Sequence, residues 1–337
     1  MLQYAVQRLI WAILLMWLVT LFTFILLHLI PGNPAIILAG LGARKSQVLA
    51  LEAQLGLNKP LAVQYWQYLY GLLELHLGRS AVTGDQVTTD LANYLPATIE
   101  LVVISFAIYT VLAVSLGAWS ARREGRVSEG MVRISAIVGS GMPVFWVGAM
   151  LQLVFFARLH WLPQGGELGI TATAPQKVTG IYLIDSLVDG DWSTFGQTVQ
   201  HLVLPVATIV LGMLAVGLRS TRASVLQELG RPYVRTAEAK GVKRLRLMVV
   251  HIMKNALNPV ISTLSLQFGY LLGWVALVET VFNWPGIGLY LYNSLQNLDY
   301  APILAITVLI SGVFILVNLI TDLVYPWLDP RLRDRQA

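Results

Sequence analysis

The chain contains no cysteine among its 337 residues. Disulfide bonds, zinc sites built from thiolates and thiol nucleophiles are therefore excluded. Charged residues are scarce too: they make up 12% of the sequence, against about 25% in an ordinary soluble domain, whereas 56% of the residues are hydrophobic. This balance indicates an integral membrane protein in a lipid bilayer.

Common catalytic motifs are also missing. The sequence has no G-x-x-x-x-G-K-[ST] phosphate loop, no H-E-x-x-H, no G-x-S-x-G and no glycine-rich dinucleotide turn. Its five histidines are scattered, which is typical of interface residues rather than metal ligands. The densest basic segment lacks interleaved aromatic residues, so no nucleic acid is expected as a partner. The chain is expected to be no enzyme and to bind neither metal nor cofactor.

Long apolar runs predict six membrane-spanning helices, because a helix needs about 20 apolar residues to cross a bilayer. The runs cover residues 6–30, 97–118, 134–157, 202–218, 257–278 and 303–324. The first run exceeds the apolar core of a cleaved signal peptide, which has about 7–15 residues, and is expected to remain as an anchor. Gly139, Gly141 and Pro143 predict a kink in the third span. The fifth is expected to begin through Asn258 and Pro259.

The distribution of lysine and arginine predicts that both termini are cytoplasmic. All but six of the 23 basic residues then fall on cytoplasmic segments. The six on the outer side are Arg44, Lys45, Lys59, Arg79, Arg158 and Lys177. In the outer segment 31–96, helical spacing of Leu, Tyr and Trp is interrupted by Asn58 and Pro60, and the segment is too polar to span. It is expected to pack against the outer mouth.

The densest basic stretch, "YVRTAEAKGVKRLRLMVVHIMKNALNPVI" at residues 233–261, lies between apolar spans. Good helix formers with the small Ala237 and Ala239 precede Gly241, which suits a helix end with a left-handed backbone. A short helix flanked by cations is shaped to enter a groove on another protein. A solvated positive-inside loop, a helix on anionic lipid and a calmodulin-like target helix are the alternatives.

Further motifs stand in a fixed order around this stretch: "PGNP", "LGLNKP", "LPATIEL", "GMPVFW", "ETVFNWPGIG", "LDY" and "DPRLR". Together they resemble the dipeptide, oligopeptide and nickel permease group of ABC importers over nearly the whole chain. Two positions depart from that group, since Asn33 replaces its usual Asp and Glu238 its usual Arg. The resemblance implies an all-α integral membrane protein of the bacterial inner membrane, with six transmembrane helices in the type I ABC importer permease fold.

The resemblance also implies a division of the chain. A first transmembrane helix (1–30) and a periplasmic segment (31–96) precede a permease core (97–326), and a cytoplasmic tail (327–337) follows. The core includes a periplasmic loop (161–200) and a cytoplasmic coupling loop (219–254). A second homologous permease subunit, two ABC ATPase subunits that bind ATP and Mg, and a periplasmic substrate-binding protein are the implied partners.

The coupling loop is implied to convert closure of the ATPase subunits into alternating access. Its implied contact residues are Arg235, Thr236, Ala237, Glu238, Ala239, Lys240, Gly241 and Arg244. Candidates for the pathway or gate are Pro143, Asn258, Gln267, Glu279 and Trp284. Two interpretations of residues 279–288 remain open: a re-entrant turn that packs the outer ends of the spans, or an outer gate with Glu279 on the translocation route. Phe282 and Trp284 are expected to anchor at the membrane interface.

Short peptides are the first expectation for the substrate, and a nickel chelate, an opine or a glutathione-like peptide are alternatives within the group. Eleven acidic residues against six basic ones on the outer side favour zwitterionic or cationic cargo. An autonomous channel or a secondary transporter is the alternative from another class, and it predicts charged midplane residues or inverted repeats. The sequence shows neither clearly.

Overall fold

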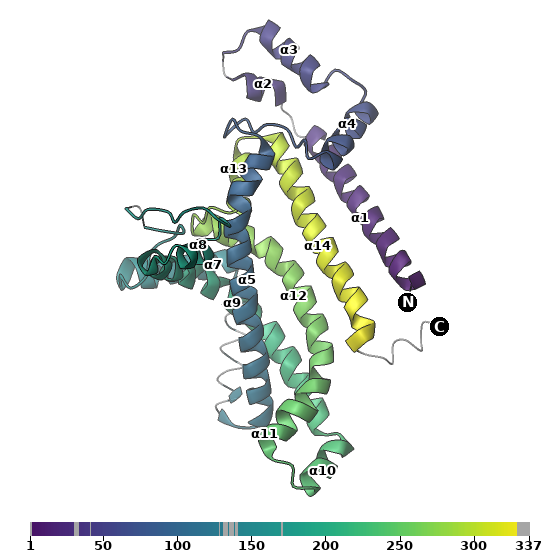
Figure 1. Cartoon of the computed structure of the whole chain (residues 1–337), viewed down its shortest axis with the longest axis vertical. Coiled ribbons are helices and arrows are strands. Elements are labelled where there is room, and N and C mark those ends of the chain that lie inside the picture. The colour runs from purple at the N-terminus through teal and green to yellow at the C-terminus, as the bar shows by residue number, and fades with distance from the viewer. Residues whose placement is uncertain are drawn as a thin grey trace. The chain divides into compact units, whose positions relative to one another are not determined.

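The computed structural model describes residues 2–29, 34–40, 42–127, 129–130, 134, 138, 141–169 and 171–328. Helices dominate this part of the chain, and its only extended pairing is an isolated bridge between Arg79 and Gln86 (Figure 1). The all-α prediction is confirmed. The chain divides into two compact units, of which unit 1 comprises Met1–Thr98 with Pro285–Leu319 and unit 2 comprises Ile99–Trp284 with Ile320–Ala337.

Unit 1 begins with four helices: α1 (Leu2–Leu29), α2 (Pro34–Ala39), α3 (Lys45–Leu55) and α4 (Leu61–Leu73). It also holds the start of α5 (Val87–Arg122), all of α13 (Ile287–Gln296) and most of α14 (Tyr300–Leu328). The predicted interruption before Pro60 is confirmed. Gly56 ends α3 with a left-handed φ of 70°, and Pro60 caps the start of α4.

A buried carboxylate ties the loop before α5 to the start of α14. One oxygen of Asp299, Oδ2, accepts hydrogen bonds from the Ser80 hydroxyl at 2.6 Å and from the backbone N–H groups of Ala81 at 2.8 Å and Val82 at 3.1 Å. Asp299 is 3% exposed, so these donors supply what water would otherwise provide. Residues more than 200 positions apart in the chain are thereby joined.

Replacing Asp299 with alanine should destabilise the protein by about 3 kcal/mol, because the variant leaves buried donors without their charged acceptor. Thermal unfolding of the purified protein in detergent would measure the loss. Asp85→Ala, which removes an exposed carboxylate from the same loop, is the matched control and should unfold like the wild type. Equal midpoints for the two variants would contradict a structural role for Asp299.

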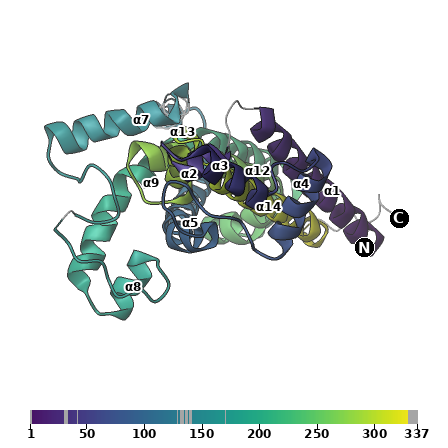
Figure 2. The same ribbon diagram turned by 90° about the horizontal axis from the view of Figure 1, so that it is seen from above.

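Unit 2 contains the remainder of α5 and the following elements: α7 (Val144–Leu151), the π-helical η1 (Gln152–Arg158), α8 (Tyr182–Val188), α9 (Trp192–Leu229), α10 (Pro232–Ala239), α11 (Arg244–Arg246), the π-helical η2 (Leu247–Ile252) and α12 (Met253–Val281). Helix α9 packs along α12 and α7, and α8 lies beside the start of α9 (Figure 2).

Small residues allow α5 and α9 to approach closely within unit 2. A Cβ atom added to Gly217 would lie 2.5 Å from the Tyr109 hydroxyl and 2.7 Å from the Ala113 methyl. One added to Gly117 would lie 2.6 Å from the Thr221 Cβ. Contacts through such glycines are a common way of packing helices in membranes, where apolar side chains gain nothing by leaving lipid.

Five helices of the described residues are long and apolar enough to cross a membrane: Val6–Leu29, Val87–Arg122, Trp192–Leu229, Arg244–Val281 and Tyr300–Thr321. They correspond to the first, second, fourth, fifth and sixth predicted spans. The third, predicted at 134–157, overlaps the shorter apolar helix Val144–Arg158, and Gly139 lies outside the described residues. The six-span prediction is consistent with this arrangement.

Pro143 and Pro259 have different effects on the helices that contain or follow them. At Pro143, where the sequence predicts a kink, the helix is interrupted: α7 begins only after this residue, whose ψ of 134° is extended. The expectation that the fifth span begins at Asn258 and Pro259 is wrong, since α12 runs from Met253 through Pro259 without a break. Helices in membranes tolerate proline where neighbouring groups satisfy the freed backbone. Asn33 and the predicted tail from residue 329 onward lie outside the described residues.

Candidate functional site

The basic segment folds as a short helix with a sharp end. Helix α10 starts with Pro232 in its first turn and ends at Ala239, as the helix-forming residues predict. Gly241 has a φ of 75°, which confirms its predicted left-handed backbone. The N–H of Gly241 donates to the Glu238 carbonyl at 2.9 Å and that of Val242 to the Ala237 carbonyl at 3.1 Å. These two bonds form a Schellman motif, which satisfies the last carbonyls of α10.

An apolar cluster packs against the inner side of α10. Its buried members come from α5, α9, α10, η2 and α12: Ala121, Val225, Val234, Leu247, Met248, Ile252 and Ala256. Ala237 and Val242 also pack against this cluster. The Ala237 methyl group therefore faces the protein's own core. Five positions implied to contact a partner are exposed around it: Arg235, Thr236, Glu238, Ala239 and Lys240.

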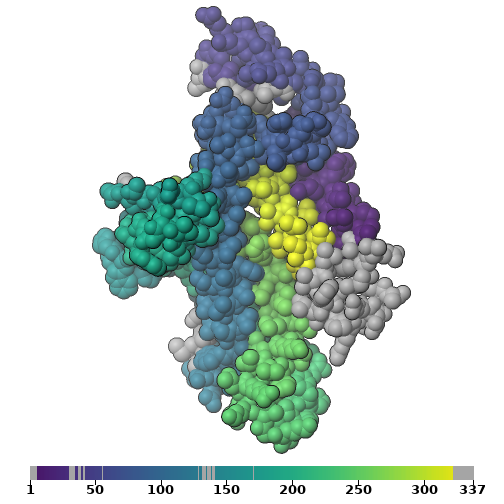
Figure 3. Space-filling model, in the orientation of Figure 1, coloured from purple at the N-terminus to yellow at the C-terminus, as the bar shows by residue number. Residues whose placement is uncertain are grey.

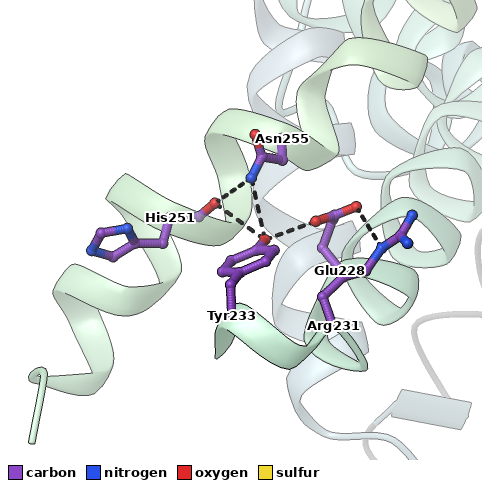
Figure 4. A network of polar contacts seen from close by, with 5 residues as sticks. All are labelled: Glu228, Arg231, Tyr233, His251 and Asn255. Atoms are coloured by element: carbon purple, nitrogen blue, oxygen red, sulfur yellow. Dashed lines mark hydrogen bonds and ion pairs between the residues drawn. The ribbon is translucent and has the colours of Figure 1, made fainter. Parts of the chain in front are cut away.

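A polar network fastens α10 to both flanking helices (Figure 4). The Tyr233 hydroxyl donates to Glu228 Oε2 at 2.7 Å, and Asn255 Nδ2 donates to the Tyr233 oxygen at 3.3 Å. Arg231 adds an ion pair with Glu228 at 3.5 Å. Glu228 lies in the last turn of α9 and Asn255 in the first turn of α12, so the network joins α10 to both long helices. The sequence offered no signal for this network, because its members are separated by up to 27 positions.

A second ion pair fixes the same end of unit 2. Arg222 Nε of α9 lies 3.2 Å from Glu129 Oε1, and its Nη2 lies 3.2 Å from Glu124 Oε1. Glu129 is buried, which makes this contact stronger than an exposed pair. Arg244 begins α11 and is exposed on the same segment. In the space-filling view the surface of α10 and α11 forms the green end of unit 2 (Figure 3).

Three of the five candidate pathway residues lie on α12, but they do not share one side of the helix. Asn258 is half-buried and Gln267 is buried. Their separation of nine residues turns them about 180° apart around an α-helix. Pro143 is exposed at the start of α7. A common lining by all these residues stays a prediction.

Three buried carboxyl groups lie toward the other end of α12, and together we call them the carboxylate cluster: Glu100 of α5, Glu167 of the loop before α8, and Glu279 of α12. Glu100 Oε1 accepts a hydrogen bond from the Leu183 N–H at 3.0 Å. Burial, together with the nearby carboxylates of Glu100 and Glu279, raises the pKa of Glu167 to about 8. Of these three residues, only Glu279 is among the candidates for the pathway or gate that the sequence predicts.

The loop that carries Glu167 is held by neighbouring helices. The ring Nδ1–H of His201 donates to the carbonyls of Gly165 at 2.9 Å and Gly166 at 3.0 Å. Gln152 Nε2 donates to the Gln164 carbonyl at 2.8 Å, and the Gly166 N–H donates to the Phe282 carbonyl at 2.9 Å. The loop is therefore pinned against the end of α12.

The expected aromatic anchor at the membrane interface is wrong. Phe282 is 1% exposed and Trp284 is 0% exposed. The Phe282 ring lies against Gly148 of α7, where an added Cβ would come within 3.1 Å of the ring. Both aromatic side chains are core residues, because the turn after α12 folds back onto unit 2 rather than toward lipid.

The raised pKa of Glu167 predicts a loss of stability with rising pH. The native state holds a proton on this group up to about pH 8, whereas the unfolded chain releases it near 4.5, so stability falls as the pH rises between these values. Thermal unfolding in detergent should show a lower midpoint at pH 9 than at pH 6, by an amount that corresponds to a few kcal/mol. Glu167→Gln should reduce this difference, whereas Asp85→Asn, at an exposed site, should leave it. The same pH dependence in all three proteins would contradict the assignment.

Comparison with known families agrees with this architecture. Residues 113–334 match the family described as the binding-protein-dependent transport system inner membrane component. The chain belongs to this family. Residues 1–102 match the N-terminal model of the same kind of transport-system membrane component. As a member of this family, the protein is a permease component of the bacterial inner membrane with multiple spans.

Similarity to individual family members extends over almost the entire chain. The probable D,D-dipeptide transport system permease protein DdpB of Escherichia coli is 39% identical, covering 93% of this chain and 92% of that protein. The dipeptide transport system permease protein DppB of Escherichia coli is 37% identical over the full length of both chains. DppB of Alkalihalophilus pseudofirmus is 36% identical over 99% of this chain and 100% of its own.

Proposed function

We propose that this family member is the transmembrane permease subunit of an ATP-driven ABC importer of short peptides. One observation carries the proposal: permeases named for dipeptide transport align with 93% to 100% of the chain. In this assembly a periplasmic binding protein delivers the peptide, a second permease subunit completes the pathway, and two ATPase subunits bind ATP and Mg. Both termini and the coupling loop face the cytoplasm.

The geometry of α10 supports its proposed role as the contact with an ATPase subunit. Its outer surface is exposed and carries Arg235 and Lys240 beside Glu238, while its inner surface is fixed on the apolar cluster. Closure of the ATPase subunits would push α10 as a rigid element. The Tyr233 network would then pass the movement to α9 and α12, which changes access to the pathway.

The carboxylate cluster supports a gate at the outer end of the pathway. Glu279→Gln keeps the volume of the side chain and removes its carboxylate from the carboxylate cluster. Under this proposal the variant should alter peptide uptake or basal ATPase activity of the assembled complex several-fold at unchanged abundance. Wild-type transport would dismiss a gating role for this carboxylate. A defect in assembly alone would favour the account in which residues 279–288 only pack the spans.

Reconstitution tests the proposed function. The tagged chain should co-purify from its native membrane with a second permease and an ABC ATPase. In liposomes, the complex with its binding protein should accumulate a radiolabelled dipeptide when ATP is present on the ATPase side. Competition by a nickel chelate or glutathione instead of dipeptides would assign one of the alternative substrates. Uptake by this chain alone would show an autonomous channel or a secondary transporter.

A further inference from the structure

Helix α4 packs against the membrane-spanning helix α1, and both belong to unit 1 (Figure 1). The hydroxyls of Tyr65 and Thr20 are hydrogen-bonded at 2.9 Å. The Tyr65 ring also meets the Phe24 ring edge-on at 5.3 Å between centroids. Nearer the end of α1, His28 Nε2 lies 3.2 Å from Gln64 Oε1. The contact thus follows α1 over more than two turns.

These contacts place α4 at membrane depth. The apolar span of α1 ends at Leu29, and Thr20 precedes this end by nine residues, or about 13 Å at the rise of an α-helix. Phe24 lies about 7 Å from the same end. The hydrocarbon layer of one leaflet is about 15 Å thick, which is half of the bilayer core. Since Tyr65 and Tyr68 contact these residues, α4 lies beside the part of α1 that one leaflet surrounds.

The side of α4 that faces away from α1 is apolar. The residues that contact α1, Gln64, Tyr65 and Tyr68, occupy one side of the helix. The opposite side, at helical spacing, is formed by Val63, Trp66, Tyr70 and Leu73, which are 42%, 70%, 62% and 84% exposed. We call these four residues the apolar face of α4.

The charges around α4 agree with a lipid environment. Residues 61–73 contain no charged side chain, whereas Lys59 precedes the helix and Glu74 follows it. Tryptophan and tyrosine are the residues enriched where lipid headgroups meet acyl chains. Exposed residues of α1 at the same depth, including Phe22, Ile25 and Leu26, are apolar as well.

We propose that the apolar face of α4 is a lipid contact surface, which inserts into the leaflet that surrounds the C-terminal half of α1. In the orientation proposed above, this is the outer leaflet. The segment between the first two spans therefore holds a helix whose apolar face contacts the lipid of one leaflet, in the way that amphipathic helices bury an apolar face in lipid. This surface braces α1 from its side and is separate from the coupling loop and the carboxylate cluster.

Spin labelling tests the proposal, because the chain has no cysteine of its own. Trp66→Cys, Tyr70→Cys and Leu73→Cys would each be labelled in the assembled complex and reconstituted in phosphatidylethanolamine–phosphatidylglycerol vesicles. Power saturation should show that oxygen reaches the labels several-fold more effectively than a water-soluble nickel chelate. Gln54→Cys, at an exposed polar position of α3, is the reference and should show the reverse order.

Two results would overturn the proposal. Preferential collision with the nickel chelate at all three positions would place this face in water, and low accessibility to both reagents would show that another protein covers it. Three positions are used so that one poorly folded variant does not decide the outcome. The measurement needs no peptide uptake, so it remains valid if the proposed substrate is wrong.

Discussion

Ala239→Trp should reduce ATP-driven peptide uptake to background while the chain still inserts and assembles its spans. Ala239 is the last residue of α10 and is exposed. In the proposed complex this end of the helix enters a groove of the ATPase subunit, and an indole ring there would prevent close docking. Uptake in proteoliposomes and the abundance of the chain in membranes measure the two effects separately.

The structure offers controls for this substitution. Ala223→Trp makes the same change at an exposed position of α9 and should retain uptake. Ala237→Trp should also abolish uptake, but for an additional reason, because the Ala237 side chain packs against the apolar cluster under α10. Its abundance should therefore fall. Normal uptake by Ala239→Trp would refute the placement of the ATPase contact at this helix end.

Gly165→Ala should unfold the end of unit 2 that contains the carboxylate cluster. A Cβ atom at this position would lie 1.8 Å from the carbonyl oxygen of Phe282 and 2.6 Å from its carbonyl carbon. Both are backbone atoms, so no flexible side chain can move aside. The loop must separate from the turn after α12, which breaks the hydrogen bond between Gly166 and Phe282. We expect a loss of about 3 kcal/mol, at the upper end of the usual cost of overpacking.

Gly169→Ala is the matched control in the same loop. An added Cβ there has its nearest neighbour at 3.6 Å, which is an ordinary contact. Thermal unfolding should therefore distinguish the two alanine variants. Single cysteines introduced at positions 162–168 should be labelled faster by a thiol reagent only when Gly165 is changed. Equal midpoints would show that the loop does not rest on the end of α12 in the membrane.

Features that depend on neighbouring residues were predictable from the sequence. Apolar runs located the spans, because crossing the bilayer depends on the composition of about 20 consecutive residues. The end of α10 at Gly241 and the interruption between α3 and α4 at Pro60 follow from backbone preferences of single residues. The ordered motifs identified the family for the same reason: they can be recognised without knowing which segments meet.

Only the tertiary structure shows which side chains are buried and which residues distant in the sequence contact one another. Glu100, Glu167 and Glu279 stand far apart in the chain, and only folding brings their charges to bear on one another. Likewise, its residue type alone would allow Phe282 to face either lipid or protein. The structure places its ring against Gly148, so the side chain is buried in protein. Local preference determined where α10 ends and where α3 and α4 are separated, whereas the contacts between distant segments decided which side chains are buried, because burial depends on what lies across the interface.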